Sequence, residues 1–201
     1  MVLDGLRRIF DEDYEILDAV TDGHALVDAY RRHRPDAAIV DISMPGLNGI
    51  DAMRKILASD PTARLIMLTM HNDHEYAAAA LRDGARGYVI KAAAADELVL
   101  ALRSVLRGGC YISPAVSGEL LAAPAANRPA PDLTLRQREV LQLMAEGHRV
   151  KTIAKMMHIS PKTVEYHKYR LMRQLHLRTT AEAVQYAVRH GIIDSSQSGD
   201  T

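Results

Sequence analysis

Cysteine is nearly absent from this chain of 201 residues, which has only one, Cys110. A single thiol cannot form an intrachain disulfide, which favours a protein of the reducing cytosol with Cys110 as a packing residue. Long apolar runs are absent too, so the sequence predicts no membrane span. The first ten residues, MVLDGLRRIF, lack the apolar core and small-residue cleavage site of a signal peptide. These absences predict a soluble, cytoplasmic protein.

The chain also has no net charge, with 25 basic and 25 acidic side chains, yet its two halves differ. Residues 1–112 hold 13 basic and 17 acidic side chains, a net charge of −4. Residues 133–193 hold 11 and 4, a net charge of +7, with five of the nine histidines. We therefore expect two domains with different partners. Residues 119–132, which include LAAPAANRPAPD, predict a linker, and residues 194–201 predict a disordered tail.

In the acidic half, strand-like and helical patterns alternate along the chain. Such alternation is typical of an α/β domain in which helices cover both faces of a parallel sheet. The predicted strands are residues 14–20, 36–40, 64–69 and 87–91, and the predicted helices are residues 23–33, 48–59, 73–84 and 94–109.

Three polar residues end three successive predicted strands: Asp41, Thr69 and Lys91. The carboxyl ends of parallel strands meet at one edge of the sheet, where α/β proteins bind ligands. An aspartate after a strand is more often a turn former or helix cap, so Asp41 alone would be weak evidence. Together, the ammonium of Lys91 and the hydroxyl of Thr69 could stabilise a phosphoryl group added to Asp41.

Three stretches carry a resemblance to a known family: IVDISMPGLNGIDAM, LTMHNDHEYAAAALRDGARGYVIK and LRGGCYISP. Over residues 1–118 the chain resembles the receiver domain of two-component response regulators, a flavodoxin-like, doubly wound fold. The resemblance implies that Asp41 accepts a phosphoryl group from a sensor histidine kinase and that Thr69 senses it. It further implies that Lys91 bridges to the phosphate, that Tyr88 is a switch aromatic, and that the Ser43 carbonyl is a magnesium ligand beside Asp41.

The chain departs from this family at its start. Receivers begin with an apolar strand that ends in an acidic pair and holds Mg²⁺, whereas this sequence starts inside the expected first helix. The cluster at residues 11–13 lies at the far end of that helix and predicts a solvated turn. A start codon assigned too late and a degenerate receiver are both open explanations, and the retained Asp41, Thr69, Tyr88 and Lys91 favour the first. With only Asp41 and Ser43 as ligands, we expect weak Mg²⁺ binding and slow phosphorylation.

The basic half reads as four helices separated by capping signals. Thr134 with Gln137, and Thr179 with Glu182, form S/T-x-x-E/Q capping boxes. Gly147 and Gly191 fit the position just past a helix end. Ser160 predicts the cap of a helix over residues 161–175, which follows a short helix at 150–157. A short helix, a tight turn and a second helix predict a helix-turn-helix.

The helix predicted over residues 161–175 has one apolar side, formed by Val164, His167, Leu171 and Leu175. Its other side could be an ordinary solvated face, but the positive charge of the segment favours a DNA-binding surface. The pattern of residues 133–193, from LTLRQREVLQLMAEG to SPKTVEYH, resembles the LuxR-type DNA-binding domain. The resemblance places this helix in the major groove of duplex DNA. The implied DNA-binding residues are Lys162, Thr163, Glu165, Tyr166, Lys168, Tyr169, Arg170 and Arg173.

Among these residues, Glu165, Tyr166 and Tyr169 match positions that face the bases. Lys162, Lys168, Arg170 and Arg173 are instead candidates for phosphate contacts, which position a protein on the duplex without specifying sequence. His167 is predicted to be a packed core histidine.

A receiver followed by such a domain is the arrangement of NarL/FixJ-type response regulators, which implies a homodimeric transcription regulator controlled by phosphorylation of Asp41. One alternative is a constitutive DNA-binding protein whose degenerate receiver serves for dimerisation. Another is a phosphotransferase or phosphatase with Asp41 as nucleophile. Haloacid-dehalogenase-type enzymes need a second acid two residues on, where this chain has Ser43, so we do not expect an enzyme.

Overall fold

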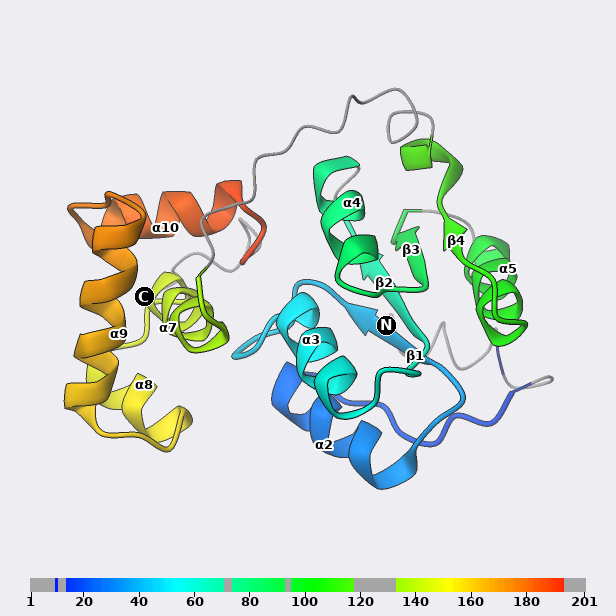
Figure 1. Ribbon diagram of the computed structural model, residues 1–201, viewed down its shortest axis with the longest axis horizontal. Helices are drawn as coiled ribbons and strands as arrows, with labels where there is room; N and C mark the ends of the chain where they lie inside the picture. Colours follow the sequence, from blue (N-terminus) through cyan, green and yellow to red (C-terminus); the bar gives the residue numbers. More distant parts are fainter. Residues whose placement is uncertain (1–9, 11–13, 71–73, 93–94, 118–132, 194–201) are drawn as a thin grey trace. The chain divides into compact units, whose positions relative to one another are not determined.

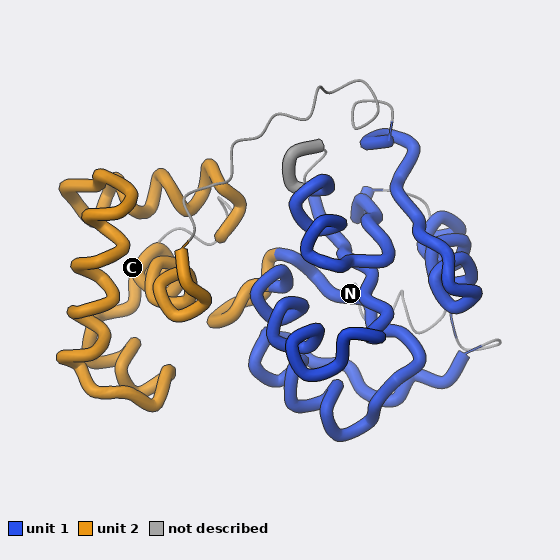
Figure 2. The backbone as a smooth tube through the Cα atoms, in the orientation of Figure 1, with its two compact units in different colours: residues 1–42, 49–125 blue, residues 43–48, 126–201 orange. Residues whose placement is uncertain are grey.

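The computed structural model describes residues 10, 14–70, 74–92, 95–117 and 133–193. The predicted linker core, the tail and the acidic cluster at 11–13 lie outside these residues. Contacts divide the chain into two compact units, one of residues 1–42 and 49–125 and the other of residues 43–48 and 126–201 (Figure 2). The predicted domain bounds, 1–118 and 133–193, stay a prediction.

The first unit is built around a parallel sheet of four strands in the order β1-β2-β3-β4. Helices alternate with these strands along the chain (Figure 1), as the alternating pattern predicts. The strands are β1 (Ala38–Asp41), β2 (Leu65–Thr69), β3 (Gly87–Ile90) and β4 (Tyr111–Ile112), and the helices are α2 (Gly23–His33), α3 (Gly49–Ser59), α4 (His74–Arg82) and α5 (Ala95–Leu106).

Helix α5 packs on one face of this sheet through an apolar cluster. The strand residues Ile66, Leu68 and Val89 face Leu98, Ala101, Leu102 and Val105 of α5, and Phe10 joins the same cluster. All of β2 is buried, because it lies between two paired strands. The rigid centre of the sheet therefore fixes the ends of β1, β2 and β3, where the predicted site residues lie.

The strand predicted at residues 14–20 is wrong: these residues form neither helix nor strand. Ile16 and Leu17 are 39% and 43% exposed. A strand is stable only when a neighbour accepts its backbone hydrogen bonds, and in the described sheet β1 is the edge strand, with no partner on its outer side. The short strand β4 was not predicted, since two residues carry no periodic signal.

The described residues 133–193 of the second unit form four helices: α7 (Leu135–Ala145), α8 (Val150–Met156), α9 (Pro161–Gln174) and α10 (Thr180–Arg189). Their apolar faces meet in one core, in which Val164 and Leu171 of α9 are fully buried. Thr134 and Gln137 form the predicted capping box at α7, and Ser160 caps α9 with Pro161 in the first turn. Thr179 caps α10, but the capping box predicted with Glu182 is only half formed, because the Glu182 carboxylate accepts from the N–H of Arg178, one residue before the cap. The predicted helix-turn-helix is therefore present in α8 and α9.

Within the part of the chain that the structure describes, no helix is both long enough and apolar enough to cross a membrane.

Candidate phosphorylation site and nucleic-acid interface

The carboxyl ends of β1, β2 and β3 bring the three predicted site residues together. The Nζ of Lys91, one residue after β3, lies 2.5 Å from the Oδ2 of Asp41 at the end of β1. The backbone N–H of Lys91 donates to the carbonyl oxygen of Thr69, the last residue of β2, at 2.6 Å. The side chains of Lys91 and Asp41 are 21% and 35% exposed, so the pair is accessible from solvent. Asp41 is thus a reachable carboxylate with a cation beside it.

Position 49, where α3 begins, requires a glycine because it lies close to the backbone of Asp41. A β-carbon at this position would lie 2.1 Å from the carbonyl oxygen of Asp41, far closer than a real contact. The N–H of Gly49 also donates to the carbonyl oxygen of Ile42 at 2.9 Å. The start of α3 therefore rests directly on the backbone that carries the carboxylate, and the absent side chain permits this approach.

Tyr88 lies inside the first unit, with no exposed surface. The register pairs Met67 with Tyr88 and Thr69 with Ile90, so Tyr88 and Thr69 lie on the same face of neighbouring strands. This position is compatible with the predicted link between Thr69 and a switch aromatic. Its role in switching stays a prediction.

The predicted magnesium ligands, Asp41 and the Ser43 carbonyl, lie two residues apart in the chain and stay a prediction. In those residues, no group of three or more His, Cys, Asp or Glu side chains is placed to hold a metal ion. The Asp41 carboxylate contacts Lys91. Because Mg²⁺ needs a near-octahedral set of oxygen ligands, this arrangement does not fit a tight site.

Sequence reasoning missed a second charged cluster, centred on Arg54 of α3. Its Nε donates to Asp83 at 2.9 Å, and its Nη1 donates to the buried Asp51 at 2.9 Å. Asp83, 29 residues after Arg54, directly follows α4, so the guanidinium links α3 to the end of α4. Nothing in a periodic pattern signals such a pair. The cluster is a structural brace between α3 and α4.

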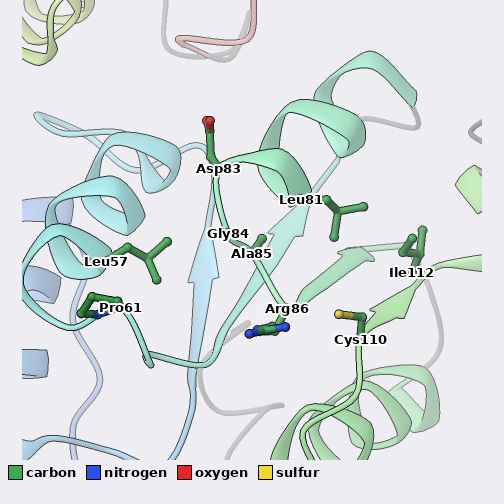
Figure 3. A pocket seen from close by; sticks show the side chains of 9 residues that line it. All are labelled: Leu57, Pro61, Leu81, Asp83, Gly84, Ala85, Arg86, Cys110 and Ile112. Atoms are coloured by element: carbon green, nitrogen blue, oxygen red, sulfur yellow. The ribbon is translucent and has the colours of Figure 1, made fainter. Parts of the chain in front are cut away.

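A shallow hollow of about 620 Å³ lies at the opposite ends of the strands from Asp41 (Figure 3). It is open and mainly apolar, and its polar side chains come from segments that precede β3 and β4. Cys110 lines this hollow. The sequence predicts a packing residue at this position, but its thiol is exposed. Its lining residues are Leu57, Pro61, Leu81, Asp83, Gly84, Ala85, Arg86, Cys110 and Ile112. None of the predicted site residues lies in this hollow.

In the second unit, α9 presents the predicted polar face to solvent. Tyr166 and Tyr169 are 52% and 65% exposed, which is unusual for such large side chains. His167, predicted to be a packed core histidine, is half-buried rather than buried, and its ring makes an edge contact with Tyr166. The other exposed residues of this face are Lys162, Glu165, Arg170 and Arg173, while Thr163 and Lys168 are half-buried.

The helix before the turn adds cations that the sequence analysis did not select. Lys151 and Lys155 of α8 are exposed, as is Arg149 at its N-cap. In helix-turn-helix proteins the first helix crosses the phosphate backbone of the duplex. The positive charge of residues 133–193 could have pointed to these residues as DNA contacts, but only the structure shows that they are exposed.

Each half of the chain matches the model of a known protein family. The model of the response regulator receiver domain matches residues 1–103, and that of the bacterial regulatory proteins of the luxR family matches residues 131–187. The oxygen regulatory protein NreC of Staphylococcus carnosus is 38% identical over 198 residues, covering 92% of this chain and 90% of NreC.

Two solved structures are also similar. RcsB from Salmonella enterica serovar Typhimurium, bound to promoter rprA in the presence of the phosphomimetic BeF3⁻, is 29% identical, with a TM-score of 0.54 and 92% of each chain covered. A structure of two RcsB dimers bound to two parallel DNAs is 28% identical, with a TM-score of 0.56, and covers 92% of this chain and 91% of that one. The chain therefore belongs to the two-component response regulators that join a receiver domain to a luxR-family regulatory domain.

Proposed function

We propose that this protein regulates transcription by binding duplex DNA through α9, under the control of phosphorylation at Asp41. The observation that carries the DNA-binding part is the division of α9 into a buried apolar side and an exposed side of basic and tyrosine residues. RcsB, with the same family arrangement, is bound to promoter DNA in its solved structure. Such a regulator would act in the cytoplasm, and DNA binding would require no enzymatic activity of the protein itself.

On α9, we assign the phosphate contacts to the exposed Lys162, Arg170 and Arg173 and the half-buried Lys168. Cations that neutralise phosphates give affinity without sequence preference. Glu165, Tyr166 and Tyr169 are assigned to the base edges, with Thr163 beside them in the first turn. The exposed lysines of α8 are placed to add contacts with the backbone. As a homodimer, the protein would read two half-sites about 10 bp apart.

The phosphorylation part rests on the contact between Lys91 and Asp41. A phosphohistidine of a sensor histidine kinase would donate the phosphoryl group: its P–N bond would break, leaving a neutral imidazole on the kinase, as a new P–O bond forms at one carboxylate oxygen of Asp41. The ammonium of Lys91 would then interact with the phosphoryl oxygens, whose added negative charge it stabilises. Thr69, whose backbone is hydrogen-bonded to that of Lys91, lies next to this point.

We expect Mg²⁺ to bind weakly, because Asp41 and Ser43 are the only protein ligands that we assign to it. Phosphorylation of the chain of residues 1–201 by a small phosphodonor should accordingly be slow and should require a high concentration of Mg²⁺.

The DNA-binding proposal is tested by titrating the full chain into labelled duplexes at several salt concentrations. The logarithm of affinity should fall linearly with the logarithm of salt concentration, by about 0.9 for each phosphate contacted. Selection from a random duplex library should then return paired half-sites. A chain that shows no salt-dependent affinity for any duplex would overturn the proposal.

A further inference from the structure

Two side chains that the assignments above treat separately are joined on α9. The Nη1 of Arg170 donates a hydrogen bond to the phenol oxygen of Tyr166 at 2.9 Å. The central carbon of the guanidinium lies 5.7 Å from the centroid of the Tyr166 ring. The residues are four apart, so they are neighbours on the helix surface. Both are exposed, on the side of α9 opposite its buried residues Val164 and Leu171.

A second contact restricts the same ring. The rings of Tyr166 and His167 lie edge to face, with centroids 5.5 Å apart and planes at 69°. His167 is half-buried, so its ring has less free space than a fully exposed side chain. The Tyr166 ring thus has His167 on one side and the Arg170 guanidinium at its hydroxyl end. A tyrosine held in this way loses less conformational entropy when it binds a partner.

The hydrogen bond also fixes what the phenol can offer to a ligand. Arginine is only a donor, so in this pair the phenol oxygen accepts, and the phenol proton stays available for a different acceptor. The positive charge of Arg170 beside the oxygen makes the phenol a stronger donor. The pair therefore presents a positioned O–H donor, rather than an acceptor, on the exposed face of α9.

We infer that Tyr166 and Arg170 act as one base-reading unit, in which Arg170 is a positioning residue for the Tyr166 hydroxyl. This inference rests on the proposed function, since it requires that α9 enters the major groove. There, guanine offers O6 and N7, adenine N7 and thymine O4 as acceptors, whereas cytosine offers the N4 donor. At the position that Tyr166 faces, the protein selects a base with an acceptor and discriminates against cytosine.

The pair changes what is expected of Arg170. A residue that only contacts phosphate weakens binding to all sequences alike when it is removed. A residue that positions Tyr166 affects the preference at one base position. Removal of either member should therefore flatten the preference at that same position, and removal of both should do little more than removal of one.

The test uses the full chain and the duplex selected by the wild-type protein, with each base placed in turn at every position of the half-site. Tyr166→Phe keeps the ring and removes the hydroxyl, and Arg170→Met keeps most of the stem and removes the donor and the charge. Each should reduce the preference at one common position about 3- to 10-fold, as expected for the loss of one hydrogen bond. The double variant should lose less than the product of the two single losses.

Tyr169→Phe and Arg173→Met are the matched controls, because both are exposed residues of the same helix. Arg173→Met should weaken all duplexes by a similar factor, and Tyr169→Phe combined with Arg170→Met should give independent losses. The inference is overturned if Arg170→Met weakens every duplex equally while the preference that depends on Tyr166 persists. It also fails if Tyr166→Phe leaves every preference unchanged. Absence of wild-type binding to any duplex would instead overturn the proposed function.

Discussion

The two functional regions of this molecule use charge in opposite ways. At the end of the sheet, opposite charges are concentrated, with Lys91 2.5 Å from Asp41 at a partly exposed site. On α9 and the helix before it, like charges are spread over an exposed surface. Close opposite charges suit chemistry at one atom, since they stabilise a specific added group. Spread positive charge suits a polyanion, whose bound counterions are released along its length.

The comparison extends to how each region is held in place. The carboxylate of Asp41 depends on a close backbone approach, in which α3 begins against the last residue of β1. The surface of α9 depends on an apolar core and on caps that lie within a few residues of the helix ends. A substitution at the close approach in the first unit should therefore cost much of that unit's stability. Each substitution on the surface of α9 should instead reduce DNA affinity by a small amount.

The largest effect is expected for Gly49→Ala. The added methyl group would lie 2.1 Å from the carbonyl oxygen of Asp41, so α3 or β1 must shift. We expect a loss of about 3 kcal/mol in the free energy of unfolding of the first unit, the upper part of the range for overpacked sites. Hydrogen exchange of the full chain should show this loss in residues 23–106 and leave α7–α10 protected.

Gly108→Ala is the control for this substitution. Gly108 has a positive φ, of 84°, which Gly49 does not have, but a β-carbon at Gly108 would meet nothing within 4 Å. Only the backbone conformation would be strained, at a cost of about 1–2 kcal/mol. Equal losses for the two variants would show that the approach to Asp41 is not the constraint at Gly49.

Arg173→Ala tests whether one substitution on the exposed face of α9 reduces duplex affinity by a small, defined amount. Loss of one phosphate contact should weaken binding to all duplexes about 5-fold and reduce the salt slope by about 0.9. Arg82→Ala, at the end of α4 in the first unit, is the matched control, because Arg82 is also an exposed helical arginine. An unchanged salt slope for Arg173→Ala would remove this residue from the interface.

A smaller effect is expected from the capping box of α7. The Thr134 side chain accepts from the N–H of Gln137, and Thr134→Ala removes this acceptor. The second unit should lose about 1 kcal/mol in its free energy of unfolding, while Thr134→Ser should retain most of it. Urea denaturation followed by hydrogen exchange can separate this loss from the first unit. An equal loss for alanine and serine would contradict the capping role.

The smallest effect concerns Tyr30, which donates to the Asp60 carboxylate at 3.0 Å. Burial, followed by the hydrogen bond and negative charge of Asp60, raises the pKa of Tyr30 to about 12. Because the folded protein holds this proton more tightly than the unfolded chain, the associated stability is present below pH 10 and is lost as the pH rises toward 12. Tyr30→Phe should lose about 1 kcal/mol near neutral pH. The difference in free energy of unfolding between variant and wild type should become smaller as the pH rises from 10 to 12. A difference that stays constant over this range would contradict the assignment.

The helical unit was predictable to within about one residue at most helix ends, because its signals are local. Ser160 and Pro161 mark the start of α9 through contacts within three residues, and Thr134 and Gln137 mark the start of α7 in the same way. The pairing of Tyr166 with Arg170 is also local, but residue types alone did not indicate that the two side chains join. Their side-chain geometry had to be observed.

The sheet was less predictable, because strand pairing is not local. Residues 14–20 have the composition of a strand but pair with no strand of the described sheet, so the periodic signal gave the wrong answer. In contrast, the meeting of Asp41 with Lys91 follows from topology, since both lie at the carboxyl ends of parallel strands. The link between Arg54 and Asp83 depends on how two helices pack, which no sequence pattern encodes.

The most direct test of the account is whether chemistry at Asp41 changes DNA binding by α9. The full chain is incubated for a long period with acetyl phosphate and a high concentration of Mg²⁺, the labelled fraction is measured by intact mass, and duplex affinity is measured before and after treatment. The account predicts that the labelled wild-type protein changes its affinity severalfold, while Asp41→Asn takes up no label and keeps its affinity. Labelled wild-type protein with unchanged affinity, or Asp41→Asn with the same label and response, would contradict the central claim.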